Sequence, residues 1–379
     1  AIPTKSLEAY EAYLLGKQRM DHRNTESMED AIEHLSKAVK SDPQFALAWS
    51  ARGHATLVRR ESAMSEKELL LNAQAAIDRA LELDPELGEA YTSLGMLRYN
   101  FDDEKGAETA FLKAIELAPN YSLTYHWYSI ILSRQGRSEE AFEMISRAAE
   151  LDPISPVIKT NLAFSLKRQG RYQHALMELE KAIAIDPTFS GAYSAMATIN
   201  YQAFNKMARA AQTYVTAIQL DPARSGYYAD LGQLYLELGE SNRAGLLFAR
   251  SQDLDPDGLG AHWGTLLLRV FKGDTDEIAD NHVMIQKNLG IGPWMTQFSL
   301  AQLRNRLIAD KQYSQALAVY SATYPKLVNE SDFAIGLQNY QAAIDLALVL
   351  QKVGELEKAN DLLDKSQDFI RERKRLGLW

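Results

Sequence analysis

The sequence predicts an all-α fold, an α-solenoid of antiparallel helix pairs, and two observations lead to this prediction. First, prolines recur every 34 or 35 residues, and a period of roughly 20 to 50 residues is typical of repeat arrays. The prolines of this series are Pro85, Pro119, Pro153, Pro187, Pro222 and Pro256. Second, the apolar and small residues between these prolines are spaced three and four apart, as on one face of a helix.

The unit that begins at Gly88 shows the expected helical hairpin. Its first helix carries Tyr91 and Gly95 on one face, and its second helix carries Ala107 and Phe111 on one face. Gly95 and Ala107 are small because the two helices should cross there at close range, where overpacking costs about 1 to 3 kcal/mol. The acidic residues 102–104 supply the turn and the start of the second helix, where carboxylates are favourable.

Glycine and proline mark the expected helix ends. A glycine follows the first helix in several units, at a place where a left-handed helix stop favours it. These residues are Gly136, Gly170, Gly239 and Gly273. At the other end of the hairpin, proline lacks an N–H donor and disfavours helix at the preceding residue, so each Asp-Pro pair should end the second helix.

The second unit is longer than the others. Pro43 precedes Pro85 by 42 residues, so this unit holds about eight extra residues. We expect them to form a longer turn between Gly53 and Ala73, with a capping box that begins at Ser65. A binding protrusion is the alternative.

The repeat pattern divides the chain at residue 258. Residues 1–258 should form seven repeat units, of which the second is expanded and the third to seventh are near-regular. Residues 259–379 should form degenerate hairpins and a C-terminal helix in the same continuous solenoid, because the pattern weakens there and residues 290–293 interrupt it. Terminal repeats diverge because they need a polar outer face. The whole chain would then hold about nine to ten helical hairpins.

Composition and motifs argue against several classes of function. A net charge of -9 with a pI near 5.4 would repel nucleic acid. The chain has no cysteine, and no charge-free run is long enough to span a membrane. Its histidines lack the i, i+4 pairing of a helical metal site, and we find no phosphate-binding loop, nucleophile elbow or catalytic carboxylate pair. We therefore expect neither enzymatic activity nor a cofactor, a bound metal or a nucleic-acid partner.

The repeat itself resembles the tetratricopeptide repeat (TPR). In the unit from Gly88 the resemblance rests on Tyr91, Gly95, Ala107 and Phe111 at the family's offsets, and the later units repeat these offsets. The family implies a right-handed superhelix in which the first helices line a concave groove that binds proteins or peptides. Carried over residue by residue, the groove positions are Met96, Tyr99, Asn100, His126, Ile130, Arg134, Asn161, Phe164, Lys167, Arg168, Tyr201 and Gln202.

These groove positions favour a particular kind of partner. They mix aromatic, amide and basic side chains, and Arg134, Lys167 and Arg168 form a locally basic stretch on an acidic protein. We therefore expect a protein or peptide partner that carries an acidic segment. The alternative is that these side chains are only solvated and that Phe164 and Tyr99 are packing residues.

One well-known TPR site is not expected here. The subfamily that binds chaperone C-termini holds two carboxylates with Lys, Asn, Asn, Lys and Arg over three consecutive repeats. In the third to fifth units these positions read Thr92, Met96, Trp127, Val157 and Asn161. A role as a chaperone partner is therefore disfavoured.

The two ends of the chain carry a second resemblance. Residues 3–16, 31–32, 38–43 and 373–379 resemble the C-terminal TPR regions of bacterial membrane-anchored winged-helix (CadC-like) regulators and cyclase-like proteins. That resemblance implies a segment of a longer, membrane-anchored protein, with the repeats in the periplasm as a sensory or docking part. A free-standing assembly scaffold and the substrate-recruiting array of a larger enzyme, such as a glycosyltransferase, are the alternatives.

Overall fold

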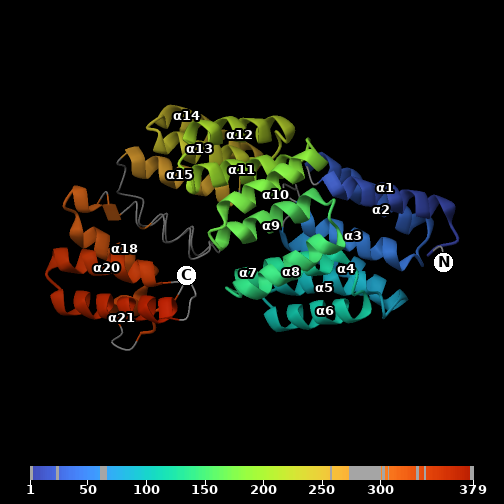
Figure 1. Ribbon diagram of the computed structural model, residues 1–379, viewed down its shortest axis with the longest axis horizontal. Coiled ribbons are helices and arrows are strands. Elements are labelled where there is room, and N and C mark those ends of the chain that lie inside the picture. The colour runs from blue at the N-terminus through green and yellow to red at the C-terminus, as the bar shows by residue number, and fades with distance from the viewer. Residues whose placement is uncertain are drawn as a thin grey trace. The chain divides into compact units, whose positions relative to one another are not determined.

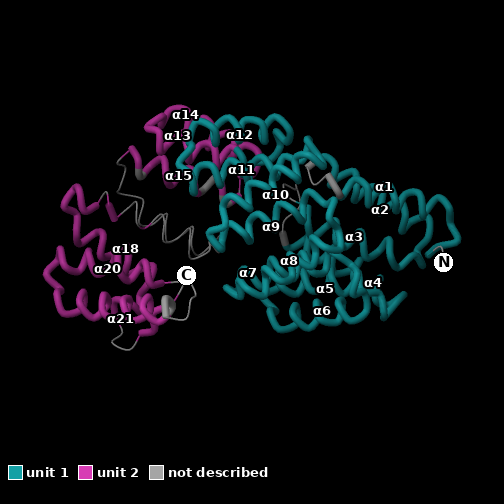
Figure 2. The backbone as a smooth tube through the Cα atoms, viewed as in Figure 1, with its two compact units in different colours: residues 1–227 teal, residues 228–379 magenta. Residues whose placement is uncertain are grey.

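A computed structural model gives the structure of the chain. It describes residues 3–22, 25–59, 66–256, 258–272, 300, 304–305, 307–329, 333–336 and 339–375. All the regular elements among these residues are helices (Figure 1), which confirms the predicted all-α fold. The chain divides into two compact units, residues 1–227 and 228–379 (Figure 2).

Unit 1 is built from consecutive antiparallel helix pairs, which lie side by side in Figure 1. The pairs are α1 (Leu7–His22) with α2 (Thr25–Ser41), α3 (Ala46–Val58) with α4 (Glu66–Leu83), α5 (Gly88–Asn100) with α6 (Glu104–Leu117), α7 (Ser122–Arg134) with α8 (Ser138–Leu151), α9 (Pro156–Arg168) with α10 (Tyr172–Ile185), and α11 (Ser190–Gln202) with α12 (Met207–Leu220). Helix α13 (Ser225–Glu237) begins in unit 1 and ends in unit 2.

Close approach between the two helices of a pair explains the small residues. A Cβ atom added at Gly95 would lie 2.8 Å from the ring of Phe111, which is fully buried. Gly232 has the same relation to Phe248 in unit 2, at 2.6 Å. Carbon atoms do not pack at such distances, so a larger residue would push the helices apart. The prediction of a tight helix crossing at Gly95 is therefore confirmed.

The turn inside each hairpin from α5–α6 to the hairpin at Gly239 contains a left-handed residue. Gly136, Gly170 and Gly239 have φ values of +80°, +73° and +80°. Units without glycine there place Asp102 (φ +59°) and Asn205 (φ +52°) in the same turn, because Asp and Asn tolerate this conformation better than other residues with a Cβ. Of the residues singled out in the sequence, Gly273, Ser65 and 290–293 lie outside the described part of the chain.

An aromatic residue in the first helix ties most neighbouring hairpins of unit 1 together. Its polar atom donates a hydrogen bond of 2.9 to 3.1 Å to the carbonyl oxygen of the proline that precedes the hairpin. The pairs are Trp49 with Pro43, Tyr91 with Pro85, Tyr125 with Pro119, and Tyr193 with Pro187. In α9 this position is Lys159, whose Nζ atom instead lies 3.7 Å from Oε2 of Glu178 on α10. Trp49 is thus a packing residue.

Unit 2 contains the rest of α13 and a separate helical core. Its other helices are α14 (Ser241–Leu254), α15 (Leu259–Lys272), α18 (Tyr313–Thr323), α19 (Pro325–Asn329), α20 (Tyr340–Val353) and α21 (Leu356–Arg375). Tyr320, Leu346 and Ala347 are fully buried in its core. The hydroxyl of Tyr320 lies 3.4 Å from Asp345, which also forms an ion pair with Arg304. The division of the repeats at residue 258 stays a prediction.

Candidate functional site

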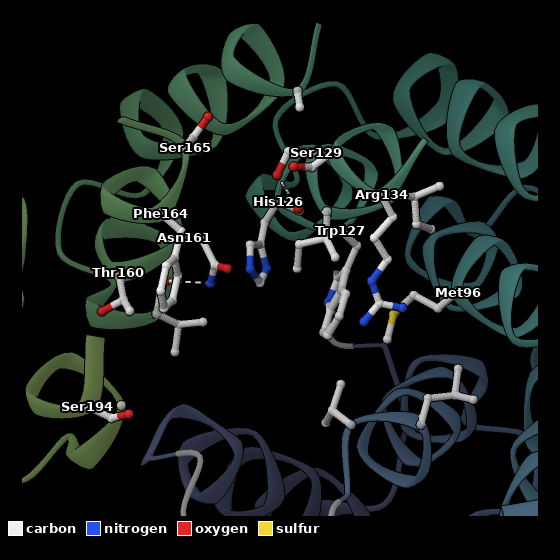
Figure 3. Close-up of a pocket in the computed structure, with 18 of the residues that line it drawn as sticks. Met96, His126, Trp127, Ser129, Arg134, Thr160, Asn161, Phe164, Ser165 and Ser194 are labelled. Atoms are coloured by element: carbon white, nitrogen blue, oxygen red, sulfur yellow. Dashed lines mark hydrogen bonds between the residues drawn. The ribbon is translucent and has the colours of Figure 1, made fainter. Parts of the chain in front are cut away.

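Unit 1 contains a cavity of about 590 Å³, which we call the unit 1 pocket (Figure 3). Side chains from the first helices of successive hairpins, α3, α5, α7, α9 and α11, line it together with residues at the start of α13. Met28 of α2 adds an apolar contact. A ligand that fills the pocket would therefore cross several first helices in succession.

The 34-residue repeat places equivalent side chains in rows across this pocket. Asn100, Arg134 and Arg168 are each 34 residues apart and form what we call the pocket row. Met96, Ile130 and Phe164 stand four residues earlier on the same helices and form the apolar row. Residues four apart lie on one helix face about one turn, 5.4 Å, from each other. The pocket wall thus has a polar stripe beside an apolar stripe.

The charged lining of the pocket is entirely basic. Among the residues that the structure describes, Arg134, Arg168 and Arg224 line it, and no aspartate or glutamate does. The guanidinium of Arg134 lies 5.5 Å from the ring centroid of Tyr99, which is a cation–π distance. Within the described residues, neither Arg134 nor Arg168 has a carboxylate within ion-pair distance. An acidic protein therefore keeps two cations in this pocket without neutralising them.

Arg168 shows the electrostatic cost of this arrangement. Its side chain is exposed to solvent, yet the concave wall surrounds it with protein atoms. This partial desolvation, and second the positive charge of Arg134, lower the pKa of Arg168. An anion placed beside the two guanidinium groups would relieve their repulsion.

Aromatic rings form part of the pocket wall. His126 is 1% exposed, and its ring lies 5.1 Å from that of Trp127. His54 of α3 packs edge-on against Trp127, with 5.8 Å between the ring centroids. Figure 3 shows Phe164 and Asn161 facing the same space as His126 and Trp127. Phe164 is 36% exposed and belongs to no described core cluster, so it is available for contact with a ligand.

Two amides of the lining are oriented by their own helices. The Nδ2 atom of Asn161 donates to the carbonyl of Val157 at 2.9 Å, and Nδ2 of Asn100 donates to the carbonyl of Met96 at 3.1 Å. These bonds leave the two Oδ1 atoms to accept hydrogen bonds from a ligand. Amide acceptors of this kind suit the N–H groups of a peptide backbone.

The structure brings together most of the groove residues expected from the sequence. The lining includes Met96, Tyr99, Asn100, His126, Ile130, Arg134, Asn161, Phe164 and Arg168. It does not include Lys167, Tyr201 or Gln202. Lys167 instead donates a 2.6 Å hydrogen bond to Oε1 of Gln202 on the next first helix. The basic stretch in the pocket is therefore formed by arginines and not by Lys167.

The expected offsets miss several lining residues because they treat every repeat alike. The lining residues of α5 lie at its C-terminal end, and those of α7 extend from His126 to Arg134. Around α11 and α13 the lining instead lies near the helix start, through Phe189, Arg224 and Tyr227. The small rotation between successive repeats moves the facing turn along each helix. The fixed offset therefore points to Tyr201 and Gln202, at the other end of α11 from its lining residues, and their predicted role stays a prediction. Leu57 and Val58 of α3 stand 42 residues before Tyr99 and Asn100, as Pro43 stands before Pro85, so they occupy the same offsets in the expanded second unit. The predicted groove positions did not extend to that unit.

Other kinds of site were sought in the same residues. Among those that the structure describes, no group of three or more His, Asp or Glu side chains could hold a metal ion. A search of the described helices also finds none that is both long and apolar enough to cross a membrane.

Sequence profiles identify the repeat. Two profiles described as tetratricopeptide repeat match the chain, one at residues 110–143 and the other at residues 88–121, 158–189 and 225–257. The last three segments correspond to the pairs α5–α6, α9–α10 and α13–α14. The predicted resemblance to this repeat is therefore confirmed. No curated protein matches the chain.

Several solved structures are similar to part of the chain. PilF of Pseudomonas aeruginosa is 20% identical, with 58% of this chain and 96% of that chain covered and a TM-score of 0.43. A tetratricopeptide repeat protein from Parabacteroides merdae is 17% identical, with coverages of 65% and 93% and a TM-score of 0.46. YrrB, described as a TPR protein with an unusual peptide-binding site, is 18% identical, with coverages of 49% and 95% and a TM-score of 0.34. At these values none of them informs the choice of partner.

Proposed function

We propose that this chain, a solenoid that carries tetratricopeptide repeats, is a non-catalytic interaction scaffold that binds an extended segment of another protein in the unit 1 pocket. The observation that carries the proposal is the lining itself, which continues without a break over the first helices of successive hairpins. A linear ligand matches such a surface because each repeat adds a further set of contacts along it.

The chemistry of the wall supports a peptide ligand. Phe164 and Trp127 offer aromatic surface for apolar side chains, and the amides of Asn100 and Asn161 offer acceptors for backbone N–H groups. The arginines favour an acidic segment, because no carboxylate in the described part of the lining competes with one. The same features give a small molecule few ways to use the whole length of the wall.

The setting of this scaffold is a further part of the proposal. In a larger bacterial regulator, as the resemblance of the terminal stretches implies, the pocket would be the docking part through which a partner protein signals. The full reading frame tests this setting. A winged-helix domain and a membrane span upstream would support it, and a downstream catalytic domain would favour substrate recruitment for an enzyme instead.

Peptide display on the purified chain tests the binding proposal without assuming a partner. We expect enriched sequences that bind the native chain and lose binding with Phe164→Glu. Leu112→Glu is the matched control, because Leu112 on α6 is also an exposed apolar residue, at 54%, but does not line the pocket. Enriched peptides that bind both variants equally, or a display without any enrichment, would contradict the proposal.

A further inference from the structure

The two rows of the pocket lie close enough for one extended chain to touch both. Arg134 and Arg168 stand one helical turn beyond Ile130 and Phe164 on α7 and α9, and a turn rises about 5.4 Å. All four residues line the same cavity. The wall of α7 and α9 therefore offers cationic groups along one edge and apolar groups along the other.

An extended peptide presents its side chains to opposite sides in alternation. A peptide that fills the pocket crosses α7 and α9, since both helices line it. One set of alternate side chains then faces the pocket row, and the other set faces the apolar row. Carboxylates on the first set would meet arginines, and aliphatic side chains on the second would meet Ile130 and Phe164.

The spacing along the peptide is compatible with this arrangement. Packed helices lie about 8 to 10 Å apart, and alternate residues of an extended chain lie about 6.6 to 6.8 Å apart. The long, flexible arginine side chains can close the remaining difference of a few ångströms. Acidic residues at positions i and i+2 can therefore each reach one of the two arginines.

We propose that the unit 1 pocket selects extended segments in which acidic and apolar side chains alternate. Arg134 and Arg168 bind the acidic side chains, and Ile130 and Phe164 contact the apolar ones. The inference rests on the proposed function and specifies its partner. A run of consecutive acidic residues fits less well, because every second carboxylate would be placed against the apolar row, where burying a charge is unfavourable. Lys167 is not expected to bind the acidic side chains, since it donates a hydrogen bond to Gln202.

Two labelled peptides of identical composition test the inference. One alternates three glutamates with three leucines, and the other carries the three glutamates as a block before the three leucines, with the same serine at each end. Fluorescence anisotropy on the full chain should give the alternating peptide at least about tenfold higher affinity, a difference that corresponds to about 1.4 kcal/mol. The preference should disappear in the double variant Arg134→Gln, Arg168→Gln.

Control variants distinguish the effect of charge in the pocket from the effects of charge elsewhere on the chain and of misfolding. Arg134→Lys with Arg168→Lys keeps both charges and should keep most of the preference. Lys113→Gln with Arg147→Gln removes two cations from α6 and α8 that do not line the pocket, and it should leave both affinities unchanged. An unchanged urea midpoint and circular dichroism spectrum would show that the pocket variants are folded.

Each remaining outcome overturns the inference. Equal affinity for the two peptides, or an alternating preference that survives Arg134→Gln with Arg168→Gln, would contradict it. Failure of both designed peptides would also contradict it. If display still yields peptides whose binding depends on Phe164, the proposed function stands and only the alternation is wrong.

Discussion

Two rows of basic residues repeat every 34 residues in unit 1, and they differ in how their charge is neutralised. The second helices carry Arg79, Lys113, Arg147 and Lys181, and each forms an ion pair with a glutamate three residues away at 2.6 to 3.0 Å. The pocket row carries Arg134 and Arg168, and neither has such a partner among the described residues. The same periodicity thus produces paired cations on one set of helices and unpaired cations in the pocket.

This difference shows what each row contributes. Exposed pairs at i, i+3 stabilise a helix by only about 0.2 to 0.5 kcal/mol, so the second-helix row adds a little to the fold. The pKa of Arg168 is lowered first by desolvation and second by the charge of Arg134. Cations that are partly desolvated and repel each other add nothing to the fold. The acidic segment that we propose as ligand would account for their position in a lined cavity, because it would bring the missing negative charge.

The largest effect is expected from a change in the core between the second helices, which carry the paired cations, and the first helices, which carry the pocket row. Phe111 on α6 is fully buried, packs against Gly95 on α5 and stacks at 5.4 Å on the ring of Tyr128 on α7. Phe111→Ala should lower the free energy of unfolding by about 3 to 5 kcal/mol, because it leaves a cavity at this junction. Urea denaturation measures this loss. The adjacent Leu112→Ala is the control, and a loss of similar size there would argue against the packing described.

A smaller, pH-dependent effect is expected where a carboxylate is held by more than one donor. The Oε1 atom of Glu108 accepts hydrogen bonds from Tyr128 at 2.7 Å and from Arg137 at 2.8 Å. These bonds, first that of Tyr128, lower the pKa of Glu108 below its ordinary 4.5. Glu108→Gln should cost about 1 kcal/mol at pH 7, a value reduced by the partial exposure of the pair.

The sign of this pH dependence follows from the direction of the shift. Because the folded-state pKa of Glu108 is lowered, its stabilisation is present above pH 4.5 and is lost as the pH falls through the folded-state pKa. The pKa of Tyr128 is raised from 10 to about 12, mainly by burial, so its contribution is lost only as the pH rises over that range. Thermal unfolding of the native chain and Glu108→Gln should therefore differ at pH 7 and converge as the pH falls below 4.5 through the folded-state pKa of Glu108. A constant difference would contradict the assignment.

The smallest effects on stability should distinguish the cations of the second helices from those of the pocket row. Arg147→Gln should lower the free energy of unfolding slightly, because it breaks the exposed pair with Glu150. Arg168→Gln should leave the stability unchanged or raise it slightly, because it removes repulsion from Arg134. Paired urea titrations in low salt can resolve the two results. A clear loss with Arg168→Gln would mean that the pocket row supports the fold.

The repeat made the fold and part of the site predictable from the sequence. The 34-residue spacing placed Arg134 and Arg168 on equivalent turns of neighbouring helices, and both line the pocket. Gly95 and Gly136 were predictable because one permits a close helix crossing and the other a left-handed turn. Each of these features depends on local geometry that recurs in every unit.

The rest of the site depends on how repeats rotate against one another, which a single repeat does not encode. That rotation brings Arg224 and Tyr227 to the pocket from the start of α13 and leaves Gln202 outside it. The 34-residue spacing also does not predict which side chains form hydrogen bonds with one another. Lys167 looked equivalent in charge to Arg168, but its hydrogen bond to Gln202 removes it from the pocket.

A crystal structure of the full chain with a display-selected peptide tests the central claim most directly. The account predicts an extended peptide across α7 and α9 in the unit 1 pocket, with carboxylates beside Arg134 and Arg168 and apolar side chains on Ile130 and Phe164. A peptide seated on the second helices, or one in the pocket that leaves both arginines without an acidic partner, would contradict it.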